Sequence, residues 1–136
     1  MKYSNLILPV KTRSATELIK HRHGVGERYV FADHNNNPTG NIYAIIRTVE
    51  NVDKPDPHVD KHAHDVDSLW MFLGDNKDLT GLQVFVILGD EKHTLDSPAS
   101  IYVPAGVQHT YGFVKGSGKY INIVLAPGGK YNENIK

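Results

Sequence analysis

His62-Ala-His-Asp-Val-Asp-Ser-Leu-Trp-Met-Phe-Leu-Gly74 is the most informative segment of this 136-residue chain. His62 and His64 lie two residues apart, and side chains with that spacing point to the same face of a β-strand. Further along, Pro104-Ala-Gly-Val-Gln-His109 supplies another histidine after a Pro-x-Gly turn, from which it can reach the first two. Imidazoles from two strands, joined by a nearby aspartate, predict a divalent-metal site inside a β-barrel.

The composition describes an ordinary globular domain. The formal net charge is zero, and 40% of the residues are hydrophobic. The apolar runs are shorter than the ~20 residues of a membrane-spanning helix, and the apolar stretch among the first residues is too short for a secretory signal. We therefore expect a cytoplasmic protein without nucleic-acid or membrane partners. Because the chain has no cysteine, nitrogen and oxygen must hold any metal, which leaves Fe, Mn, Ni, Co, Cu or Zn.

The predicted secondary structure is mostly β. A capping box at Ser14 and Glu17 predicts a short helix that ends near His23. Roughly eight short strands follow and indicate a closed or double-sheet β-barrel; we expect them at Glu27–Ala32, Asn41–Glu50, Ser68–Leu73, Leu82–Leu88, Glu91–Leu95, Ile101–Val103, Gln108–Val114 and Tyr120–Leu125. We expect a turn at 115–119 between the last two. The predicted organisation is an N-terminal extension (1–40) packed on a barrel (41–126), then a tail (127–136).

The two histidine motifs resemble those of the cupin superfamily. In the first cupin motif, His-x-His is followed by a Glu, then by six residues and a Gly. Here Asp67 takes the place of the Glu, and six residues separate it from Gly74. The second motif contains Pro-x-Gly-x2-His, which matches Pro104 to His109. The chain departs from the family pattern at three positions: the acidic residue is an Asp one position early, Pro98 replaces a Gly, and Phe113 replaces an Asn. The resemblance implies an all-β, double-stranded β-helix (jelly-roll) fold.

The resemblance also implies a ligand set for one divalent ion, namely His62, His64, Asp67 and His109, with two coordination positions left open. Asp65 is the alternative carboxylate if the strand twists, although Asp67 has the better spacing to Gly74. Tyr111 and Phe113 are in phase with His109 on their strand and should line the same interior.

Cupins with three histidines and a carboxylate include dioxygenases, decarboxylases, lyases and isomerases. The resemblance therefore implies a mononuclear metalloenzyme for a small organic molecule, with dioxygen chemistry as the leading expectation. Tyr111 and His58 are the candidates for proton transfer. The alternatives are a non-catalytic cupin that binds a small ligand or a metal, and a cupin isomerase or lyase. We also expect a homodimer formed through sheet edges.

Overall fold

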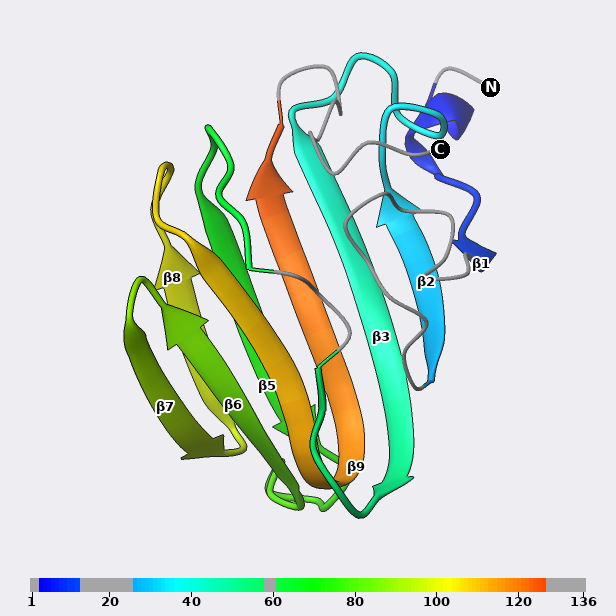
Figure 1. Cartoon of the computed structure of the whole chain (residues 1–136). Helices are drawn as coiled ribbons and strands as arrows, with labels where there is room; N and C mark the ends of the chain where they lie inside the picture. The colour runs from blue at the N-terminus through cyan, green and yellow to red at the C-terminus, as the bar shows by residue number, and fades with distance from the viewer. Residues whose placement is uncertain (1–2, 13–25, 58–60, 127–136) are drawn as a thin grey trace.

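The computed structural model describes residues 3–12, 26–57 and 61–126, and the regular secondary structure of these residues is almost entirely β-strand. In chain order the elements are the 3-10 helix η1 (Ser4–Leu6) and the strands β1 (Lys11–Thr12), β2 (Glu27–Ala32), β3 (Ile42–Val52), β4 (Asp56–Pro57), β5 (Ser68–Gly74), β6 (Leu82–Leu88), β7 (Glu91–Asp96), β8 (Ala99–Val103) and β9 (His109–Leu125) (Figure 1). No helix in this part of the chain is long and apolar enough to cross a membrane.

The strands pair antiparallel throughout and form two facing layers. One layer has the order β1-β2-β3-β9-β5-β8, and the second half of β9 takes part in it. The other layer consists of β7, β6, the first half of β9 and the short β4, and its β6–β7 hairpin lies in front of the first layer in Figure 1. This is the all-β barrel that the sequence predicts. The sheet also includes β1 and β2, which precede the expected start of the barrel at residue 41.

The last strand differs from our expectation. We predicted two strands separated by a turn at 115–119, but β9 is one continuous strand of 17 residues. Its first half pairs with β6 as far as Gly116, and its second half pairs with β3 and β5. Gly116 has a φ of +103°, and a Cβ at Gly118 would lie 2.1 Å from the Leu73 carbonyl oxygen. The two glycines therefore let one strand bend from one layer into the other.

Regular alternation of side chains builds the interior. On β5, every second residue from Ser68 is buried, and on β3 the same holds from Tyr43 to Val49. Burial of one large apolar side chain contributes about 1.5–3 kcal/mol to the stability of the folded state. The buried core is formed by Val30, Tyr43, Ile45, Val49, Trp70, Phe72, Leu82, Val84, Val86, Ile101, Val103, Tyr111, Phe113, Tyr120, Val124 and Ala126.

Several predicted elements are confirmed. β2 has the predicted bounds, and β6 and β7 form the predicted hairpin around Gly89 and Asp90. The predicted helix at 14–23 and the tail at 127–136 lie outside the described residues.

Candidate metal centre

Three histidines from two segments of the chain meet in the interior. His62 and His64 precede β5, and His109 is the first residue of β9. One nitrogen from each ring lies within 4.8 Å of the others, and all three residues are buried. The ring centroids are 4.5 to 5.2 Å apart. The structure thus brings together the three histidines that the two motifs predicted.

Backbone hydrogen bonds fix the positions of these histidines. His62 and His109 form an isolated antiparallel bridge, in which the N–H of each donates to the carbonyl of the other at 3.1 and 2.7 Å. The N–H of Gly106 donates to the His64 carbonyl at 2.7 Å. The Pro-x-Gly turn therefore holds one end of the His-x-His segment, while the start of β9 holds the other.

The hydrogen bond of His109 selects its ligand atom. Its Nδ1 lies 2.8 Å from the carbonyl oxygen of Val107. Because a carbonyl can only accept, Nδ1 carries the proton, and the lone pair of the neutral ring is on Nε2. A backbone carbonyl in this role is typical of histidines that bind metals.

The donor set fits a divalent metal ion. Three imidazole nitrogens suit Zn, Cu, Fe or Ni, and their small separation allows one ion to contact all three. Among the described residues, this group of possible ligands contains no carboxylate.

Asp67, the expected fourth ligand, has other partners. Its Oδ1 accepts a hydrogen bond from the Ala105 N–H at 2.8 Å, and its Oδ2 accepts one from the Tyr102 hydroxyl. The Tyr102 hydrogen bond, followed by that from Ala105, lowers the pKa of the Asp67 carboxyl below its ordinary value. Asp65, the alternative carboxylate, is exposed and also lies outside the histidine group. The sequence reasoning missed Tyr102, because the pairing of β5 with β8 brings it beside Asp67 from 35 residues away.

Aromatic rings line the interior next to the histidines. The Trp70 ring lies 5.3 Å from that of His109 and 5.3 Å from that of Tyr111. Tyr111 is 3% exposed and stacks on Tyr120 at 4.2 Å. Tyr111 therefore faces the interior as predicted. The ring of Trp70 lies between Tyr111 and the three histidines. His58, the other candidate for proton transfer, lies outside the described residues.

Two arginines in the interior were not identified from the sequence. Arg28 and Arg47 are 3% and 2% exposed, and they lie opposite one another on β2 and β3. Arg28 donates to the Tyr43 hydroxyl at 2.9 Å, and Arg47 hydrogen-bonds to Tyr111. Burial lowers the pKa of the Arg47 guanidinium, as does the neighbouring Arg28, whereas Tyr111 raises it. Strict alternation could have located both, since Arg28 is in phase with Val30 and Arg47 with Ile45.

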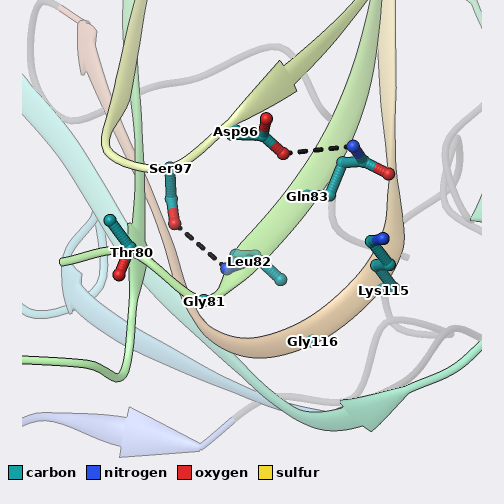
Figure 2. A pocket seen from close by; sticks show the side chains of 8 residues that line it. All are labelled: Thr80, Gly81, Leu82, Gln83, Asp96, Ser97, Lys115 and Gly116. Carbon is teal, nitrogen blue, oxygen red and sulfur yellow. Dashed lines mark hydrogen bonds between the residues drawn. The ribbon is translucent and has the colours of Figure 1, made fainter.

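A pocket of about 370 Å³ lies beside Lys115 and Gly116, at the end of the first half of β9 that is farther from His109 (Figure 2). The side chains of Gln83, Asp96 and Ser97 line it. Gln83 donates to Asp96 at 3.1 Å, and Ser97 Oγ accepts from the Leu82 N–H at 3.1 Å. None of the three histidines lines this pocket, so it is separate from the histidine cluster.

Comparisons with known proteins agree on the fold. No protein-family model matches the sequence, and no curated protein matches it. Among solved structures, an RmlC-like cupin from Shewanella frigidimarina superposes with a TM-score of 0.52 at 18% identity, covering 82% of this chain and 86% of that one. Bacillus subtilis oxalate decarboxylase, described with Mn(II) centres, gives a TM-score of 0.54 at 13% identity, covering 91% and 31%. The Fe(II) form of HppE gives 0.52 at 15% identity, covering 86% and 56%.

This chain spans most of the RmlC-like cupin but only part of the oxalate decarboxylase and HppE chains. At these levels of identity the likeness concerns the fold. The two-layered sheet, the bent last strand and the meeting of His62, His64 and His109 agree with it. The chain therefore has the cupin fold, as its two histidine motifs implied.

Proposed function

We propose that this protein is a mononuclear metalloenzyme that acts on a small organic molecule inside its barrel, with a dioxygenase-type oxidation as the leading reaction class. The observation that carries the proposal is the buried group of three histidines, whose nitrogens lie within 4.8 Å of one another. Structural relatives described with Mn(II) and Fe(II) support a redox-active ion among the expected metals.

His62, His64 and His109 would hold the ion. When bound, such an ion supplies Lewis-acid or redox chemistry and leaves coordination positions for other ligands. The ring of Trp70 beside His109 gives the site an apolar wall that excludes water. The Tyr111 hydroxyl, which hydrogen-bonds to Arg47, is the group that could hold or transfer a proton at Oη.

Other expectations stay predictions. His58 retains its expected role in proton transfer, and the ligand role of Asp67 becomes a question for experiment. A homodimer, a cytoplasmic location and a small-molecule partner are likewise predictions from sequence.

The test begins with metal content. The protein is purified without chelator, and bound metal is measured by mass spectrometry for the wild type and for His109→Gln. We expect one ion per chain in the wild type and loss of stoichiometric metal in the variant. The matched control is His93→Gln, because His93 is a half-exposed histidine on β7 that interacts with Glu91 at the surface. It should keep its metal.

Oxygen consumption is then followed with catechols, thiols and keto acids. Uptake that depends on both bound metal and His109 supports the proposed enzyme. Stoichiometric metal without turnover of any of these substrates favours a non-catalytic cupin. A wild type that binds no divalent metal contradicts the proposal altogether.

A further inference from the structure

The outer face of the larger layer, which points away from the barrel interior, is apolar at its centre. The outward residues of β3, β9 and β5 are only partly buried there, whereas the inward residues between them are buried. An antiparallel sheet with one face in water normally alternates apolar inward residues with polar outward ones. Here the outward residues form two apolar rows across the three strands, namely Ile46, Ile121 and Met71 in one row and Ala44, Ile123 and Leu69 in the next.

The outer face of the smaller layer has a different character. Gln83 on β6 lies opposite Asp96 on β7 and Lys115 on β9. Ile87, further along β6, lies opposite Lys92. Polar and charged side chains thus accompany the apolar ones, as is usual for a face in contact with water. The contrast between the two outer faces indicates that the larger layer packs against an apolar surface.

The shape of the larger face suits a second copy of itself. Ile42 and Leu125 are opposed at one end of the face, and their side chains are 43% and 59% exposed. Towards the other end, on the side of β5 and β8, a hollow of about 260 Å³ is bounded by Met71, Leu73 and Pro98. A two-fold axis brings a surface patch against itself, so the exposed end of each copy can meet the hollow of the other.

Size, charge and composition favour a second copy over other segments of this chain. From β2 to β8, the apolar centre covers about 400 Å² by strand geometry, which is about half of the roughly 800 Å² that each partner buries in a stable interface. The formal net charge is zero, so two copies approach without overall repulsion. The sequences of residues 13–25 and 127–136 are rich in charged and polar residues and contain too few apolar ones to cover this face.

We propose that this protein forms a homodimer in which the outer faces of the two larger layers pack on each other about a two-fold axis. Sheets packed face to face lie about 10 Å apart, so the outward side chains of the two copies interdigitate. This dimer uses a face of the sheet instead of the sheet edges expected from the sequence. It does not rest on the proposed function, because the three histidines lie inside the barrel.

The test is sedimentation equilibrium of the full chain over a range of concentrations. We expect the wild type to have twice the 15.2 kDa mass of one chain. Ile123→Glu places a charge in the centre of the interface once from each copy, and it should weaken the dimer about a hundredfold or more. The matched control is Ile87→Glu, because Ile87 is a partly buried isoleucine on the outer face of the smaller layer. It should dimerise as the wild type does.

Thermal unfolding shows whether each variant folds. Where Ile123→Glu does not fold, Ile42→Glu decides and should weaken the dimer about tenfold or more. Its control is Leu79→Glu, because Leu79 is 41% exposed in the 75–81 loop and Ile42 is 43% exposed.

A monomeric wild type would overturn the proposal. Undiminished dimerisation of a folded Ile123→Glu or Ile42→Glu variant would also overturn it, since the two copies would then meet through another surface, such as the sheet edges. Equal weakening of the dimer in the matched controls would overturn it as well.

Discussion

Replacing Asp67 with asparagine should weaken metal binding only about tenfold or less, although the cupin resemblance implies that Asp67 is a ligand. The reason lies in its contacts. Asp67 accepts hydrogen bonds from Tyr102 and from the Ala105 N–H, and the next residue, Gly106, donates to the His64 carbonyl. The carboxylate therefore restrains the turn that positions His64.

The magnitude follows from this indirect role. Loss of a partner that orients a metal ligand typically costs about 10–100-fold in metal affinity. Asp67→Asn retains an oxygen that can accept a hydrogen bond from the Ala105 N–H, so its metal affinity should fall by about tenfold or less. Asp67→Ala removes both hydrogen bonds and should approach the upper end. His109→Gln removes one of the three ring nitrogens and should abolish stoichiometric binding.

The assay is a Co²⁺ titration followed by visible absorbance, in competition with a chelator of known affinity. Asp78→Asn is the matched control, because Asp78 is an exposed aspartate whose pKa is likewise lowered by hydrogen bonds, in its case from Thr80. It should leave Co²⁺ affinity unchanged. If Asp67→Asn loses Co²⁺ as completely as His109→Gln, Asp67 is a ligand and the reasoning from its hydrogen bonds is refuted.

Further predictions concern stability. Phe113→Ala empties a fully buried position and should lower the free energy of unfolding by about 3–5 kcal/mol in urea titrations; a loss below 1 kcal/mol would mean that the core around it collapses without cost. Gly118→Ala places a Cβ against the Leu73 carbonyl and should destabilise the protein by about 1–3 kcal/mol. An unchanged midpoint of thermal unfolding would argue against this close approach of β9 to β5. The lowered pKa of Asp67 contributes stability that is present above its ordinary value of 3.8 and is lost as the pH falls through the folded-state value. Tyr102→Phe removes the hydrogen bond that does most to lower the pKa of Asp67. On acidification, the free energy of unfolding of this variant should therefore fall less than that of the wild type; equal losses would contradict this.

The sequence predicted most of the fold because much of it is encoded locally. The alternation of buried residues located β5, and β-rich runs around Gly89-Asp90 located the hairpin of β6 and β7. The same local reasoning failed at Gly116-Ser-Gly118, where glycines between β-rich runs indicate a turn. The close approach of Gly118 to Leu73, which requires a residue without a Cβ, depends on strands distant in sequence.

The candidate site shows the same division. The histidines were predictable because each motif carries its own spacing, and the strand pairing only had to bring the two together. The partners of Asp67 were not predictable, because Tyr102 reaches it through the pairing of β5 with β8. Arg28 and Arg47 were accessible to alternation alone, but only the register of β2 with β3 shows that they are opposed.

The continuity of β9 restricts how this protein can change in evolution. One strand carries His109 at its start, Tyr111 in its first half and the partner of Arg47 in its second half. Inserting or deleting a single residue in its first half would turn inward-facing side chains outward, and outward-facing ones inward, beyond that point. The candidate metal-site and core positions would then be lost together. Changes in length should therefore be tolerated in the 75–81 loop, while β9 should vary by substitution alone.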